Sequence, residues 1–152
     1  MCNVKFEDNT VKVTEALEGA INKFLEEAAG ELEAQTKRNT RVNSTKTKES
    51  WTHVVNKDKK EAIVGNPMEN AIWEEFGTGE YAVNGDGRKG AWYVPVEKVT
   101  GRKKPTYNGK VTIVYGKNGQ KFYKTNGKKP TRALQKAFDS RKNTIIKRGE
   151  KL

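Results

Sequence analysis

The segment with the clearest potential for chemistry is residues 85–90, Gly-Asp-Gly-Arg-Lys-Gly, which match the pattern G-x-G-x-x-G. In dinucleotide-binding proteins this pattern follows a strand and opens a helix whose N-terminus meets the phosphates. Here the preceding residues are predicted to form a loop, and residues 91–94 (Ala-Trp-Tyr-Val) are predicted to form a strand. The context of the match therefore does not predict a nucleotide site.

Other residues that could do chemistry are too few or wrongly spaced. His53 is the only histidine and Cys2 the only cysteine, so the chain lacks the ligands of a structural zinc site and cannot form an intrachain disulfide. Glu74 and Glu75 are adjacent and would point about 100° apart on a helix, which is typical of a solvated helix end. We expect no enzymatic activity, no metal site and no cofactor, and we expect His53 to be a partly buried packing residue.

The charge of the chain is high and uneven. The formal net charge is +11, yet residues 1–36 carry three Lys and eight Asp or Glu. The basic remainder favours a polyanionic partner, because counterion release and long-range attraction both act on such a surface. An acidic N-terminal helix could also dock on the basic body of a second copy. Solubility alone explains the same pattern equally well, so both readings stay open.

Basic and aromatic residues alternate in residues 88–93 and 121–124. Such stretches can bind phosphates and stack on bases, and they are equally typical of a sheet whose edges are guarded by lysines. The predicted DNA contact is weak and independent of sequence, and its candidate residues are Lys121, Lys124, Lys128 and Lys129.

The first half of the chain is dominated by one helical pattern. Residues 3–13 alternate weakly and predict a short strand, and Thr14 is the expected N-cap of a helix over residues 14–37. A polar loop is expected over residues 38–48. The apolar face of the helix is expected to be a core face and consists of Leu17, Ile21, Phe24, Leu25, Ala28 and Leu32.

Shorter elements follow, joined by turns. Residues 50–56 and 62–64 predict the two strands of a hairpin, and Pro67 precedes a short helix over residues 68–75 with Ala71 and Ile72 facing inward. Five glycines then predict a long loop from Gly77 to Gly90, which we expect to be mobile in a free subunit.

The second half predicts strands and a final helix. Residues 91–96 form a strand kept at an edge by Pro95, and a hairpin turns at Asn118-Gly119 between residues 111–115 and 122–123. A helix opens at Pro130, and its end, residues 147–152, is expected to fray.

These elements predict a single α+β domain over residues 1–152. Its long N-terminal helix and its C-terminal helix pack on a small antiparallel sheet, with a short central helix and a long glycine-rich loop. No stretch approaches the roughly 20 apolar residues of a membrane helix, and no signal peptide is evident, so we expect a soluble protein with no membrane partner.

Residues 71–79, Ala-Ile-Trp-Glu-Glu-Phe-Gly-Thr-Gly, resemble a family of tail components of long-tailed phages related to the gene-ten product of phage HK97. In that family a short apolar helix ends in a Glu-aromatic-Gly-Thr-Gly turn, followed by a variable loop, strands and a proline-led C-terminal helix. The resemblance covers residues 11–146. The C-terminal motif departs from the family, because residues 130–134 (Pro-Thr-Arg-Ala-Leu) lack its aromatic residue.

The resemblance implies a structural, non-enzymatic protein of the virion. It implies a tail completion or head–tail joining protein that forms a homo-oligomeric ring, for example a hexamer, between neck and tail-tube proteins. Such a protein would pass through the host cytoplasm during assembly. The runner-up is a basic nucleic-acid-binding accessory protein, and a small nuclease has only basicity in its favour.

The resemblance also points to a subunit interface. Trp73 and Phe76 are expected to anchor the Gly-Thr-Gly turn against the sheet, with the following loop projecting to a neighbour, and Arg88 and Lys89 are expected to meet the neighbour's acidic helix. The predicted interface residues are Trp73, Phe76, Gly77, Thr78, Gly79, Tyr81, Val83, Arg88, Lys89, Glu26, Glu27, Glu31 and Glu33.

Overall fold

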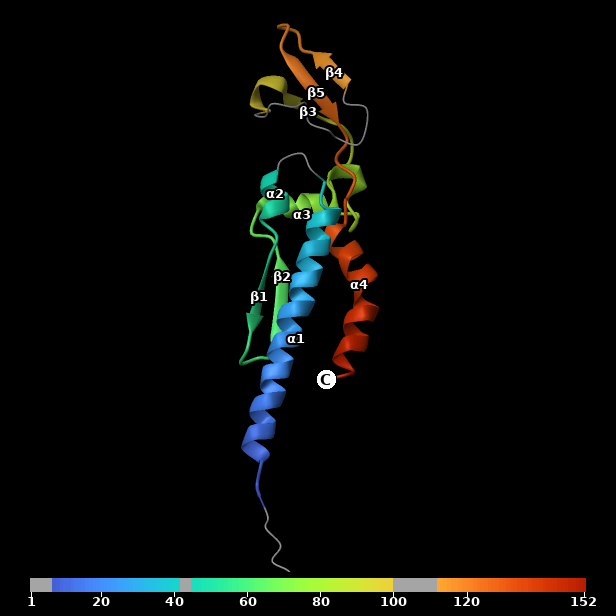
Figure 1. Cartoon of the computed structure of the whole chain (residues 1–152). Helices are drawn as coiled ribbons and strands as arrows, with labels where there is room; N and C mark the ends of the chain where they lie inside the picture. The colour runs from blue at the N-terminus through green and yellow to red at the C-terminus, as the bar shows by residue number, and fades with distance from the viewer. Residues whose placement is uncertain (1–6, 42–44, 100–111) are drawn as a thin grey trace, which may run out of the picture.

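In the computed structural model, which describes residues 7–41, 45–99 and 112–152, helix α1 (Thr10–Asn39) forms the long axis of an elongated molecule (Figure 1). Its 30 residues span roughly 45 Å. The Asp8 carboxylate accepts hydrogen bonds from the backbone N–H of Thr10 at 2.9 Å and from the Thr10 hydroxyl at 2.5 Å. The predicted N-cap at Thr14 is therefore wrong, and so is the predicted strand over residues 7–13. Residues 3–6 of that strand lie outside the described part of the chain.

Two elements flank the C-terminal part of α1 (Figure 1). On one side a hairpin is formed by β1 (Thr52–Asn56) and β2 (Glu61–Gly65), paired antiparallel as predicted. On the other side lies α4 (Ala133–Gly149), where Ala137 is fully buried and Ala29 of α1 nearly so. Small side chains at this contact let the two helix backbones approach closely, so the core is compact and narrow.

Two short helices lie at the upper end of α1. Helix α2 (Thr45–Glu49) stands where a loop was predicted, and α1 itself continues to Asn39, so the predicted loop over residues 38–48 is largely wrong outside the undescribed residues 42–44. Helix α3 (Glu69–Phe76) follows Pro67 as predicted. Ala71 is buried on its inner face. Ile72 was predicted to face inward but is 61% exposed, because α3 contacts its neighbours through one narrow face only.

The remaining strands form a second sheet beyond the ends of the helices (Figure 1). Its order is β3-β5-β4, with β3 (Trp92–Pro95) and β4 (Thr112–Tyr115) at the edges and β5 (Lys121–Thr125) between them. Pro95 lies in an edge strand and the hairpin turns at Asn118-Gly119, both as predicted. Two short 3₁₀ turns, η1 (Gly79–Tyr81) and η2 (Val96–Lys98), precede and follow β3.

The α+β class is confirmed, and its strands form two separate sheets rather than one. The helices pack on the β1–β2 hairpin and not on the three-stranded sheet. We call residues 77–130 the upper lobe and the remaining described residues the helical body. Helix α4 runs to Gly149, three residues into the stretch that was predicted to fray. Within the described ranges, no helix is long and apolar enough to cross a membrane.

Candidate assembly interface

The joint between the two parts of the molecule is the Gly77-Thr78-Gly79 turn at the end of α3. The Thr78 N–H donates to Lys128 O at 2.9 Å, and the Lys128 N–H donates back to Thr78 O at 3.2 Å. The Glu80 N–H donates to Asn126 O at 3.0 Å. These bonds form a short bridge between the chain leaving α3 and the chain leaving β5.

Glycine is required in this turn for two reasons. Gly77 ends α3 at φ 75° and Gly79 has φ 62°, which are left-handed conformations that side chains disfavour. A Cβ on Gly77 would lie 2.8 Å from Lys128 O, and one on Gly79 would lie 2.7 Å from the Trp92 ring and would clash with Asn126 O. The predicted sharp end of the short helix is therefore confirmed, with close backbone contact as an additional cause.

Glu74 and Glu75 join the turn to the start of α4, which corrects the expectation of a solvated helix end. The Glu75 carboxylate accepts hydrogen bonds from the backbone N–H groups of Leu134 and Gln135, each at 3.0 Å. It therefore caps the N-terminus of α4 from another helix, where negative charge is favourable. The Glu74 carboxylate pairs with the Lys128 ammonium and accepts a 3.3 Å bond from the Thr131 hydroxyl. Adjacent residues thus hold two different parts of the returning chain.

Trp73 and Phe76 do not anchor the turn against a sheet, contrary to prediction. Trp73 is 55% exposed and Phe76 is 48% exposed. The backbone bridge and the two glutamates hold the turn without them, and the three-stranded sheet lies on the far side of the joint. The two aromatic residues instead present apolar surface to solvent.

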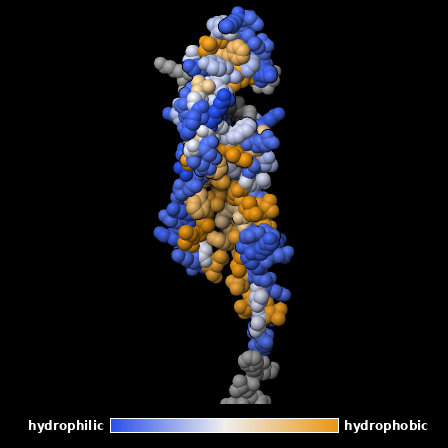
Figure 2. All heavy atoms as spheres, turned by 180° about the vertical axis from the view of Figure 1, so that it is seen from behind, coloured by the Kyte–Doolittle hydropathy of each residue, from blue (hydrophilic) through white to orange (hydrophobic). Residues whose placement is uncertain are grey.

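An apolar groove adjoins this exposed surface. It has a volume of about 450 Å³ and lies between the hairpin and α4, with α1 beneath it and α3 at its end. Figure 2, seen from behind, shows hydrophobic side chains gathered along the middle of the helical body, where the surface is hollowed. The apolar residues that line the groove are Leu32, Trp51, Ala71, Ile72, Phe76, Leu134 and Phe138. We call this the α3–α4 groove.

The sequence did not identify this groove, because it assigned Ile72, Leu134 and Phe138 to the core. Phe138 is 49% exposed. A usable signal was present in α3, whose residues 71–73 are apolar on successive positions and cannot all face one side of a helix. Such a helix must either be buried all round or leave apolar surface uncovered.

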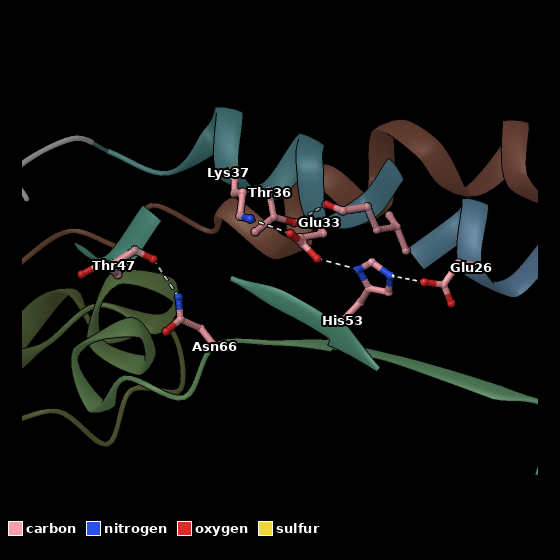
Figure 3. Close-up of polar contacts among 8 residues, drawn as sticks. Glu26, Glu33, Thr36, Lys37, Thr47, His53 and Asn66 are labelled. Carbon is pink, nitrogen blue, oxygen red and sulfur yellow. Dashed lines mark hydrogen bonds and ion pairs between the residues drawn. The ribbon is translucent and has the colours of Figure 1, made fainter. Parts of the chain in front are cut away.

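His53 lies between two acidic side chains of α1, as Figure 3 shows. Its Nδ1 is 2.5 Å from Glu33 Oε2, and its Nε2 is 3.3 Å from Glu26 Oε1. The Glu33 carboxylate also accepts a 2.5 Å bond from the Lys37 ammonium. The hydrogen bond with Glu33 raises the pKa of His53, and the bond from Lys37 lowers the pKa of Glu33, with His53 adding to that effect. His53 is partly buried, and it joins the hairpin to α1.

A third acidic residue of α1 is also engaged within the chain. Glu31 pairs with the guanidinium groups of Arg141, at 3.4 Å, and Arg148 on α4. Glu27 is exposed at the end of α1 near Arg148. The four acidic residues predicted to face a neighbour therefore lie along α1, and three of them hold α1 to its own hairpin and α4. Their part in a subunit interface stays a prediction.

The loop residues predicted at the interface lie on the upper lobe. The Arg88 guanidinium lies 5.6 Å from the Trp92 ring centre, and the Lys89 ammonium donates to Gly85 O at 3.2 Å. Tyr81 and Val83 are exposed, although the Val83 N–H donates to Phe76 O at 2.9 Å. The first half of the loop is thus hydrogen-bonded to the joint. The predicted mobility stays a prediction, and it applies best to residues 84–89.

The four lysines proposed for DNA contact lie in different surroundings. Lys121 and Lys129 lie over the rings of Tyr115 and Tyr81, at 5.9 and 5.6 Å. Lys128 is mostly buried against Glu74. Lys124 is exposed in the middle of the sheet, in register with Tyr93 and Thr112. The structure therefore does not bring all four to one surface, and only Lys128 is occupied by an acidic partner among these described contacts.

The described residues contain no group of three or more His, Cys, Asp or Glu side chains placed to hold a metal ion. Two of the interactions in Figure 3 are instead structural: the Asn66 side chain donates to Thr47 O at 2.8 Å, and the Thr36 hydroxyl donates to Leu32 O at 2.7 Å. The first ties α2 to the end of the hairpin, beside the α3–α4 groove.

Comparison with known proteins gave one match. Residues 5–77 match the family model described as "Bacteriophage HK97-gp10, putative tail-component". The matched segment contains α1, the hairpin, α3 and the first glycine of the joint. Searches of curated proteins and of solved structures each found no significant match.

Proposed function

Because residues 5–77 belong to the HK97-gp10 family of phage tail components, we propose that this protein is a structural, non-enzymatic subunit of a ring at the head–tail interface. In this proposal it acts as a tail completion or head–tail joining protein. Membership of the family supports a phage tail component and a place in the virion. The ring and its position at the neck are the further step.

The observation that carries this step is the amount of apolar surface left around the joint. Ile72, Trp73, Phe76 and Phe138 are each about half exposed or more, and all but Trp73 line one groove. Single exposed apolar residues are ordinary, whereas a contiguous patch beside a pocket is typical of a protein–protein interface. The surface is therefore suited to assembly with other protein subunits.

The test is to locate the protein in purified particles. Immunogold labelling or cryo-electron microscopy of virions and isolated tails should place it at the head-proximal end of the tail in a ring of copies. Virions assembled without the protein should contain heads and tails that do not join. Absence from purified particles, or a position at the distal tail tip, would contradict the proposal.

A second candidate function follows from the charge of the upper lobe. Residues 77–130 carry 12 Lys or Arg and only three Asp or Glu. A basic accessory protein that binds nucleic acid would need such a surface, and a ring subunit through which DNA passes would also benefit from it. DNA binding by free subunits combined with absence from particles would favour the accessory protein.

A further inference from the structure

We propose that the N-terminal turns of α1 from one copy dock in the α3–α4 groove of a second copy. The inference deepens the proposed function, on which it rests, by naming the two surfaces that would join neighbouring subunits. The argument begins with a helix face that the molecule itself leaves uncovered.

The apolar stripe of α1 continues past the elements that pack on it. Farther along the helix, Phe24 packs against Gly149 at the end of α4. Val13 and Leu17 lie four residues apart on the same face, one to three turns earlier. They are 64% and 49% exposed. In Figure 1 this part of α1 extends below both the hairpin and α4. An isolated amphipathic helix gains most of its stability from packing, so an unpacked end is suited to a partner.

The α3–α4 groove has the size and lining to receive this face. Its volume is about 450 Å³, whereas an apolar cavity of about 150 Å³ admits a benzene ring. Binding an amphipathic helix in an apolar groove is a common recognition mode, read through anchors at i and i+4. Val13 and Leu17 have that spacing, with β-branched and γ-branched side chains that would fit between Ile72 and Phe138.

Charge favours this pairing over other partners. Residues 7–18 carry four Asp or Glu and one Lys, and Glu15 lies between the two apolar anchors along the helix. Beside the groove, residues 132–149 carry six Lys or Arg and one Asp. The single acid, Asp139, accepts a hydrogen bond from the Gln135 side chain at 3.1 Å. Opposite charges would steer the encounter and set the orientation of the docked helix.

The two surfaces lie at different ends of the molecule, because the groove is at the α3 end of α1 and the free face is at its N-terminal end (Figure 1). A contact between them is heterologous: each copy gives one surface and receives the other. Such contacts close into a ring when the rotation between copies allows it, and otherwise form an open filament. A ring subunit requires a contact of this type.

Disulfide trapping tests the contact directly. In a Cys2→Ser background, Leu17→Cys and Phe138→Cys are made in separate chains, mixed and oxidised mildly. We expect a cross-linked dimer in which mass spectrometry finds residue 17 joined to residue 138. The matched control is Lys57→Cys, an exposed residue in the hairpin turn, mixed with Leu17→Cys. A yield no higher than this control would overturn the inference.

Substitution at the free face provides an independent test. Leu17→Glu and Phe138→Glu should each raise the concentration needed for self-association by at least tenfold, measured by analytical ultracentrifugation. Their melting temperatures should stay near the wild-type value, because both side chains are half exposed. Unchanged self-association of both variants would overturn the docking. If docking fails while the protein is found at the neck, the proposed function stands; if it is absent from particles, the proposed function fails whatever the cross-linking shows.

Discussion

The helical body and the upper lobe of this molecule are held by different interactions. In the body, side chains join the elements: Ala29 packs near Ala137, and Glu31 pairs with two arginines of α4. In the upper lobe, backbone hydrogen bonds of three short strands and of the joint carry most of the order, and Tyr123 and Thr125 are its buried side chains other than glycine. The position of the lobe therefore depends on a few residues at the joint.

The two parts also differ in charge. The upper lobe has nine more basic than acidic residues, whereas the other 98 residues of the chain have 18 basic and 16 acidic residues. A nearly neutral body with exposed apolar surface is suited to contacts between proteins, and a basic lobe is suited to an anion. One small chain thus separates two kinds of surface, and the experiments below test that separation.

The largest effect is expected from Gly79→Ala in the joint. A methyl group there would clash with Asn126 O and the Trp92 ring, and the residue would remain at φ 62°. We expect a loss of about 3 kcal/mol in the free energy of unfolding, measured in urea. Gly85→Ala is the matched control, because Gly85 has φ 72° but open space around it, and it should cost about 1 kcal/mol. Equal losses would show that the close contacts at the joint do not matter.

The next effect concerns the cap that α3 supplies to α4. Glu75→Ala removes the acceptor of two backbone N–H groups, and we expect a loss of about 1–2 kcal/mol. Thermal unfolding followed by circular dichroism measures it. Glu69→Ala, at the exposed start of the same helix, should change stability by less than about 0.5 kcal/mol. A smaller effect at Glu75 than at Glu69 would mean that α4 is capped by solvent.

DNA binding should distinguish the upper lobe from the body. We expect the double variant Lys121→Gln, Lys124→Gln to weaken binding and to lower the slope of log affinity against log salt by about 2, because each lysine contacts one phosphate. The control is Lys57→Gln, Lys59→Gln in the exposed hairpin turn of the body, which removes the same charge. If the two double variants lose affinity equally, net charge and not the upper lobe determines binding.

The smallest effect is a dependence of stability on pH within the body. Because the pKa of His53 is raised by Glu33, its contribution is fully present below its ordinary value near 6.5 and is lost as pH rises through the higher folded-state pKa. The lowered pKa of Glu33 gives a contribution that is present above its ordinary value near 4.5 and is lost as pH falls through the folded-state pKa.

Stability from this pair should therefore be greatest between about pH 4.5 and 6.5. The expected size is about 0.5 kcal/mol or less, since both side chains remain partly exposed. His53→Gln should remove the decline above pH 6.5 in urea unfolding. A decline of the same size in this variant would assign the effect to other groups.

Periodicity and turn chemistry by themselves determined much of the secondary structure. The stripe from Leu17 to Leu32 predicted α1, and the alternation around Asn118-Gly119 predicted the β4–β5 hairpin. These are local properties, fixed by residue spacing and by backbone conformations that glycine accepts. The Glu-Phe-Gly-Thr-Gly motif also identified the family and the sharp end of α3.

Tertiary structure alone decided how these elements share the available apolar surface. Ile72 and Phe138 were assigned to a core because they are apolar and suitably spaced, yet both are exposed, since α3 and α4 each have only narrow contacts. Glu74 and Glu75 looked like a solvated helix end, but they bind residues more than 50 positions away. Spacing along a helix shows which side chains share a face, whereas only the packed fold shows whether anything lies opposite that face.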